Sequence, residues 1–458
     1  MSGLFASLSA AAHSLDAQRY GLDVTGQNIA NLNTEGYVRR RIELAERQPI
    51  DGVGGVEVLG VRATRDAFID QRLRSELPAE SRDSAMASAL SVVETSLGST
   101  GRSIDGALNS LFTAFSALSV DPQSSVARDG VLLQASRLAT AFHEMSARLE
   151  SSRQQGDSDI RGSVDQINQL ASTIADLNAQ IGGAPTGADV EPLRDRLDVA
   201  LQGLSKLTTI SVISQPRGTV DVAIGSGRAL VVGGESYSLA VTNAPGSGLA
   251  EIRAGGVDIT DSLEGGSIGG LLAVRDEVLP DYQAQLDQLA YDVTTKINQV
   301  HSTGYDLNGN TGPLLYLPLP SASGAAAAMK VDPVVAADSS RIAASATGAP
   351  GDNGIARQLA DLRNADAARG GTATFTEAWS VLVNTVGSDS ASAKNSLSMR
   401  QETVSAIQRL RDSVSGVSLD EEAGRLMQFQ RAYEANARFF AAVDSSLSVL
   451  MQTFGAPR

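Results

Sequence analysis

The sequence predicts a mainly α protein with a β insertion, built from terminal coiled-coil helices, an elongated helical core domain and a small antiparallel β domain. Three observations lead to this prediction. Apolar residues recur in alternating steps of four and three at both ends of the chain, which is the heptad spacing of coiled coils. More helical periodicity lies inside these ends, and short β-branched runs between glycines occupy the middle.

The N-terminal heptad stripe predicts a helix over residues 2–31, because its apolar members fall on one helical face. Gln18 and Thr25 occupy the two polar positions, and Gly36 supplies a natural stop. The stripe consists of Leu4, Leu8, Ala11, Leu15, Leu22 and Ile29.

The C-terminal stripe predicts a helix over residues 418–454, about 55 Å long at 1.5 Å per residue. Gln430 and Asp444 interrupt it, and Ser418 and Glu421 have the spacing of a capping box that would begin the helix. Its apolar members are Leu419, Ala423, Leu426, Tyr433, Ala437, Phe440, Leu447, Met451 and Phe454. Amphipathic helices often cover only their own core. Here the narrow stripes have no adjoining segment to cover them except the other terminus, which favours self-assembly.

The periodicity divides the chain into three nested parts. We expect a terminal coiled-coil assembly segment at 1–47 with 415–458, a helical core at 48–206 with 267–414, and a β domain of five or six strands at 207–266. Such a chain goes out along an axis and returns, so its termini should lie together. The helices expected within the core are 86–97, 108–118, 124–181, 190–206, 276–300, 355–368 and 375–414.

Composition excludes several classes of function. The net charge is −15, whereas a nucleic-acid binder normally presents a basic face. We therefore interpret the arginines at 39–41 and 47 as a solvated strand or a protein contact. The chain has no cysteine and three distant histidines, so we expect no metal site and no cofactor. No apolar run is long enough to span a membrane, and the first residues lack the pattern of a cleaved signal peptide.

Three short motifs have ordinary explanations, and we predict no catalytic residue. Gly265 to Gly269 match the G-x-S-x-G elbow of serine hydrolases around Ser267, followed by Asp276 and His301, but no parallel sheet surrounds them. We interpret the match as a glycine-rich connection. The stretch from Asp306 begins like a calcium loop but lacks the required glycine and glutamate, which favours a turn. The acids at 420–422 are explained by the dipole of the helix that they begin.

Four segments resemble the family of flagellar rod, hook and hook-associated proteins. NIANLNTEGY (28–37) is similar to the signature that the axial members share, with Glu35 in place of the family's usual proline or similar residue. Residues 269–312, 351–362 and 415–451 resemble the branch of the family that joins hook to filament. Many members are longer, and residues 313–350 are too few for their further outer domain.

The resemblance implies a structural subunit that self-associates into a sleeve between hook and filament. It implies an inner tube of terminal helices, an outer tube of core helices and an outward β domain. The implied partners are hook protein, the second junction protein (hook-associated protein 3), and an export chaperone at the C-terminal segment, with no nucleic acid and no membrane. The implied location is extracellular, on the flagellum, after export without a cleaved signal peptide.

Two alternatives remain open: another axial protein, such as hook or distal rod, or a flagellum-associated hydrolase. The predicted assembly interface comprises Leu4, Leu8, Leu15, Leu22, Asn28, Ile29, Asn31, Gly36, Tyr37, Leu426, Tyr433, Phe440, Leu447 and Met451.

Overall fold

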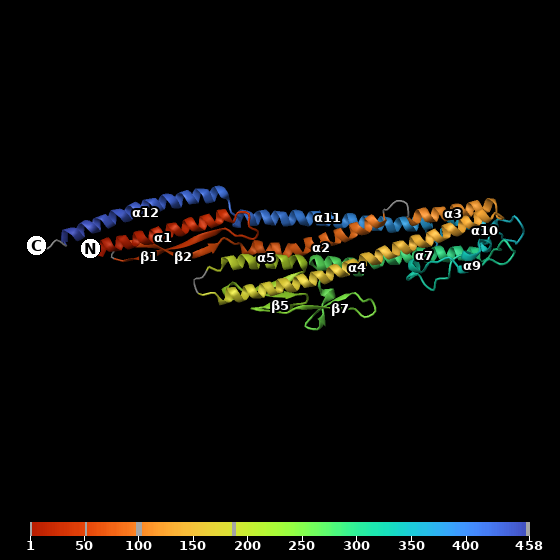
Figure 1. Ribbon diagram of the computed structural model, residues 1–458, viewed down its shortest axis with the longest axis horizontal. Helices are drawn as coiled ribbons and strands as arrows, with labels where there is room; N and C mark the ends of the chain where they lie inside the picture. Colours follow the sequence, from red (N-terminus) through yellow and green to blue (C-terminus); the bar gives the residue numbers. More distant parts are fainter. Residues whose placement is uncertain (1, 51–52, 98–102, 186–188, 455–458) are drawn as a thin grey trace.

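The protein is a long rod of helices whose two termini lie at the same end (Figure 1). The computed structural model describes residues 2–50, 53–97, 103–185 and 189–454. The chain runs outward from the terminal end over residues 67–97 and 104–120, comes back along 125–183, runs outward again over 191–301, and returns to the terminal end through the long helix at 375–415. The termini therefore lie together as expected, but the rod is traversed twice in each direction.

The terminal end consists of two helices and a hairpin. Helix α1 (Ser2–Ala30) packs against α12 (Leu419–Phe454), and the two run in opposite directions (Figure 1). Strands β1 (Arg40–Ile50) and β2 (Val53–Ala63) form an antiparallel hairpin that also packs on α1. The boundary that was expected between the terminal assembly segment and the helical core, at residues 47 and 48, therefore lies inside β1.

The residues of α12 that face α1 are not all those of the predicted heptad stripe. Gly21 of α1 has no side chain, and the Phe429 ring fills the space that a Cβ would need, with ring carbons 2.5–2.7 Å from that position. Val443 and Leu447 are buried. The face toward α1 thus includes positions 422, 429 and 443, each one residue before the predicted positions 423, 430 and 444. This register avoids both polar interruptions, Gln430 and Asp444, which lie on the exposed side.

The two longest helices of the core, α4 and α11, both run from the far end back toward the terminal end. Helix α11 lies beside α2, and α4 packs against α3 and α5. The helices of the core are α2 (Ala67–Leu97), α3 (Ile104–Val120), α4 (Ser125–Gly183), α5 (Glu191–Leu207), α6 (Gly266–Ala273), α7 (Leu279–His301), α8 (Ala325–Ala328), α9 (Pro333–Ala337), α10 (Gly354–Asp361) and α11 (Phe375–Ser415). A π-helical turn (Val274–Val278) joins α6 to α7, and 3-10 turns lie at Ser339–Arg341 and Leu362–Asn364.

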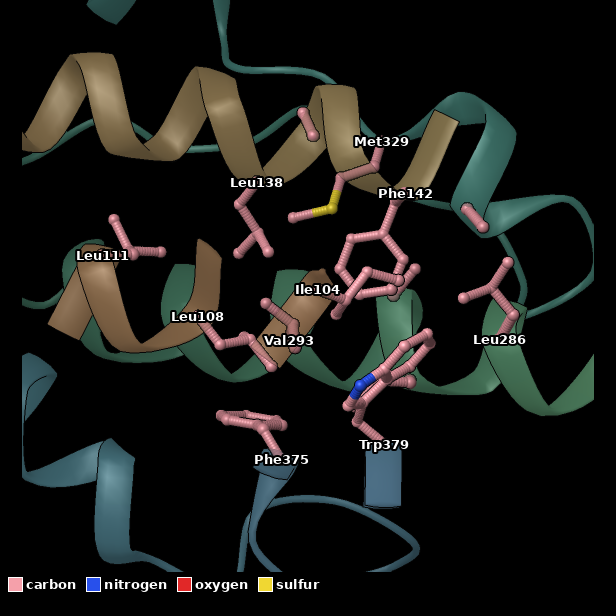
Figure 2. Packing of buried hydrophobic residues seen from close by; sticks show 14 of the residues in the cluster. Ile104, Leu108, Leu111, Leu138, Phe142, Leu286, Val293, Met329, Phe375 and Trp379 are labelled. Carbon is pink, nitrogen blue, oxygen red and sulfur yellow. The ribbon is translucent and has the colours of Figure 1, made fainter. Parts of the chain in front are cut away.

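The hydrophobic core at the far end is built from aliphatic residues around a few aromatic ones (Figure 2). Leu108 and Phe142 are completely buried between α3, α4 and α7, and Phe375 and Trp379 close the cluster from α11. Phe112 stacks on Phe375 with ring centroids 6.1 Å apart. The apolar faces of α3, α4, α7 and α11 are therefore covered by one another at this end of the rod.

The β domain contains two small antiparallel sheets, one of four strands and one of three, against the five or six strands expected. Its apolar residues share a core with α4 and α5, including Ile160 and Leu230. Gly266 has a positive φ of 72°, and a Cβ there would lie 2.2 Å from the backbone carbon of Leu207. The chain therefore leaves the β domain where it entered. The strands are β3 (Ile210–Ser214), β4 (Val220–Ile224), β5 (Arg228–Val232), β6 (Glu235–Ser236), β7 (Leu239–Asn243), β8 (Ala250–Ala254) and β9 (Val257–Asp258), with 3-10 turns at Pro216–Gly218 and Thr260–Ser262.

Candidate functional site: the joint between the terminal helices and the core

Asn28, in the last turn of α1, is the centre of a polar joint between the terminal segment and the core. Its Nδ2 donates to the backbone oxygen of Arg40 and to Oε2 of Glu422, each at 2.9 Å. Its Oδ1 accepts from the Tyr37 hydroxyl at 2.9 Å and from the backbone N–H of Arg40 at 3.0 Å. All four hydrogen-bonding positions of the amide are therefore used, and the residue is only 1% exposed.

Arg39 ties α12 to this joint. Its Nε and its Nη2 each lie 2.7 Å from Oε1 of Glu422, which is completely buried. Nη2 also lies 2.6 Å from Glu421, whose side chain is 61% exposed. Burial by itself would lower the pKa of Arg39, but the hydrogen bonds to Glu421 and Glu422 raise it above its ordinary value. The backbone N–H of Arg39 donates to the oxygen of Ser415, at the end of α11.

Arg40 and Arg65 tie the hairpin to α5 in the core. Arg40 donates to Asp195 at 3.0 Å, and its guanidinium lies 4.9 Å from the centre of the Tyr37 ring. Arg65 pairs with Glu191 and Asp195 and lies 3.4 Å from Asp198. Burial would lower the pKa of Arg65, but the carboxylates on α5 raise it.

The ion pairs continue into α2 and α11. Arg74 of α2 lies 3.7 Å from Asp198, and Asp70 of α2 accepts from Arg411 of α11 at 2.9 Å. Burial raises the pKa of Asp198 above its ordinary value, and Arg65 opposes this effect. Charged side chains from the terminal segment and from three core helices thus form one network.

Gly36 sets the path of the connecting loop. Its φ is +78°, which favours glycine, and a Cβ would lie 2.2 Å from Cγ2 of Val199 on α5. The loop therefore rests directly on the core. Asn28, Gly36 and Tyr37 together explain the spacing of the N-terminal signature segment.

Several predicted interface residues make contacts within their own chain. Asn28 was expected in the assembly interface, but its amide is enclosed by its own chain. Tyr37 and Gly36 serve the same joint, and Asn31 donates to the backbone oxygen of Gln27 at the end of α1. Along the stripes, Leu447 is buried, and Tyr433 and Met451 are 39% and 62% exposed. The half-buried members are Leu4, Leu8, Leu15, Leu22, Ile29, Leu426 and Phe440.

One interpretation of charged residues was wrong and another was incomplete. Arg39 and Arg40 were expected on a solvated strand or at a protein contact, but each is 6% exposed inside the joint. The acids at 420–422 lie in the first turn of α12, where they were expected to meet the helix dipole, and Glu421 and Glu422 also pair with Arg39. The sequence did contain an indication of this joint, since two adjacent arginines follow the asparagine of the signature segment. It did not indicate which acidic residues would form ion pairs with them.

The residues of the hydrolase motif do not form a catalytic group. Ser267 lies in the first turn of α6, and His301 ends α7, roughly 50 Å farther along the helical run at 1.5 Å per residue. The His301 Nδ1 lies 2.5 Å from the oxygen of Pro313, and its Nε2 accepts from the N–H of Ala343. Burial lowers the pKa of this histidine to about 4. The glycines around Ser267 permit close packing, since a Cβ at Gly269 would lie 2.2 Å from the backbone oxygen of Glu264.

The remaining predictions concern metals and membranes. Asp306 accepts from the backbone N–H groups of Asn308 and Asn310 and pairs with Arg341, which is the geometry of a turn. Within the described ranges, no three metal-binding side chains gather at one point. The part of the chain that the structure describes also contains no helix with the length and hydrophobicity to cross a bilayer.

Family models match three separate parts of the chain. The flagellar hook-associated protein FlgK helical domain matches residues 90–316. The flagellar basal body rod FlgEFG protein C-terminal model matches residues 411–453, and the flagella basal body rod protein model matches residues 8–37. The fold, the joined ends and these matches define an axial structural subunit of the bacterial flagellum.

Curated relatives narrow this class. Flagellar hook-associated protein 1 of Bacillus subtilis is 27% identical over 503 residues, covering 99% of both chains. The proteins of the same name from Salmonella typhimurium and Escherichia coli are 26% and 25% identical, and each match covers 95% of this chain. The solved flagellar hook junction protein FlgK from Burkholderia pseudomallei shares the fold, with a TM-score of 0.67 at 19% identity over 75% of this chain and all of that one. The chain belongs to the flagellar hook-associated protein 1 family.

Proposed function

We propose that this protein forms the junction between the hook and the filament, as a structural subunit that assembles through its terminal helices. The observation that carries the proposal is the extent of the likeness: the match to the Bacillus relative covers nearly the whole length of both chains. The geometry supports it, because a rod whose two ends form one helical pair presents that pair as a single unit to neighbouring copies.

The matches also favour a junction subunit over hook or distal rod. The rod-type models match only the two ends, whereas the helical-domain model covers residues 90–316 between them. The experiment is immunogold labelling of isolated flagella. Gold at the boundary between hook and filament is expected, and gold along the hook or at the rod would contradict the assignment.

The finer partners are proposed on the family resemblance. They are hook protein on one side, hook-associated protein 3 on the other, and an export chaperone that holds the C-terminal segment before export without a cleaved signal peptide. Co-purification of the intact chain with the candidate chaperone, and its loss when residues 419–454 are removed, tests the last of these.

A structural role without catalysis belongs to the same proposal. The packing of the glycines around Ser267 and the separation of this serine from His301 support it.

A further inference from the structure

The exposed sides of the two terminal helices carry charge patterns of opposite sign with the same spacing. In each helix three charged residues follow steps of three and four, so they share one face and span about 10.5 Å. The α1 triplet is negative, positive, negative: Asp16, Arg19 and Asp23. The α12 triplet is positive, negative, positive: Arg431, Glu434 and Arg438.

Neither triplet is neutralised by its own chain. All six side chains are exposed. The one ion pair that they form within the described residues joins Arg19 to Asp16 at 3.9 Å, with both side chains 63% exposed. Exposed pairs of this kind contribute little. The charges are therefore available to another molecule.

The register between α1 and α12 explains why the chain cannot pair its own triplets. Asn28 contacts Glu422, and seven residues back along α1, Gly21 contacts Phe429, seven residues forward along α12. The same antiparallel register places Asp16 level with Glu434. It likewise places Arg19 level with Arg431. Charges of the same sign thus lie at the same level of the pair.

Exposed apolar side chains accompany both triplets. On α1, Phe5 and Tyr20 are 55% and 46% exposed, and their spacing from Asp16 places them on the same side of the helix. On α12, Met427 and Val449 are 53% and 58% exposed and flank the α12 triplet on its side. Each surface therefore combines an apolar area with a fixed charge pattern, as coiled-coil contacts do.

We propose that the α1 triplet of one copy docks against the α12 triplet of a neighbouring copy, so that the terminal pairs lie side by side. This proposal rests on the proposed function and names the surface through which copies associate. Complementary charges select this partner and fix its position along the helix, and the apolar side chains supply the buried area.

Charge exchange tests the proposal in the full-length chain. The α12 swap is Arg431→Glu, Glu434→Arg and Arg438→Glu, and the α1 swap is Asp16→Arg, Arg19→Glu and Asp23→Arg. Each swap alone should raise the concentration needed for polymerisation roughly tenfold or more, because like charges then face each other. The two swaps in one chain should restore polymerisation, because complementarity returns. Sedimentation and electron microscopy measure the polymer, and circular dichroism checks that each variant keeps its helical content.

A matched control changes two exposed arginines far from the terminal helices, Arg137→Glu with Arg228→Glu, and should assemble like wild type. If the wild type polymerises and either triplet swap polymerises equally well, the docking of the two triplets is refuted while the proposed function stands. The same conclusion follows if the combined swap does not restore polymerisation. Wild-type protein that neither polymerises nor restores motility to cells lacking it would overturn the proposed function itself.

Discussion

Removing the buried charge of Glu422 should release α12 from the joint. Glu422 is completely buried and accepts from Arg39 and Asn28, whereas the adjacent Glu421 meets the same arginine from a position that is 61% exposed. Glu422→Gln keeps the size of the side chain but removes the buried charged partner of Arg39, so that only the exposed Glu421 still pairs with this guanidinium. Breaking a buried ion pair in this way costs about 3 kcal/mol or more.

The expected effect is local, because the terminal pair can open while the core remains folded. A cost of about 3 kcal/mol corresponds to a roughly hundredfold increase in the open fraction of α12. Hydrogen–deuterium exchange followed by mass spectrometry reports this as faster exchange in peptides from the first half of α12 and the end of α1. Peptides from α3 and α4 should be unchanged.

Glu421→Gln is the matched control, since it removes the same charge from the neighbouring residue at an exposed position. We expect exchange close to wild type. Equal exchange in the two variants, or protection of α12 in Glu422→Gln within threefold of wild type, would refute the argument that the buried carboxylate holds the joint.

Three further predictions concern other parts of the chain. Gly21→Ala should reduce the protection of α1 in hydrogen exchange, because overpacking against Phe429 costs about 1–3 kcal/mol. Gly26→Ala has open space around it and should increase the protection of α1, because alanine stabilises a helix by about 0.5–1 kcal/mol relative to glycine. Greater protection in Gly21→Ala than in Gly26→Ala would contradict the packing of Gly21 against Phe429. His301, with a pKa lowered by burial to about 4, contributes stability that is complete above its unfolded pKa of 6.5 and is lost as pH falls toward 4, by about 3 kcal/mol. His301→Gln should flatten the fall in Tm between these pH values, and an unchanged slope would count against this histidine as the cause. Ser267→Ala should leave motility and the absence of esterase activity unchanged, and a non-motile but folded and exported variant would reopen the hydrolase alternative.

Periodicity predicted most helices because it reports burial directly, although the helix expected at 86–97 begins at Ala67. The predicted limits of the two terminal helices agree with α1 and α12 within about one residue. The choice between two overlapping heptads was harder, since Leu426, Phe440 and Leu447 belong to both. Each of the two heptads contains two polar residues, Glu422 and Asn436 in one and Gln430 and Asp444 in the other, so polarity alone does not separate them.

The joint could not be predicted from sequence in the same way. Its partners come from positions as distant as Asn28 and Glu422, and pairing between distant charges leaves no periodic pattern. The hairpin was missed although its strands alternate apolar and charged residues, as Ile42, Glu43 and Leu44 do, which is the pattern of a sheet with one face covered by a helix. Arg39 therefore looked like a surface residue until its partners were in place.

The return of the chain at Gly266 to the backbone of Leu207 has a mechanical consequence. Tension applied along the rod can pass from α5 to α6 through this contact, so residues 208–265 lie outside the path of the load. The β domain is then shielded from stretching while the helices transmit pull and torque. We expect a flagellar subunit with this connection to keep its β domain folded while its helices carry the load.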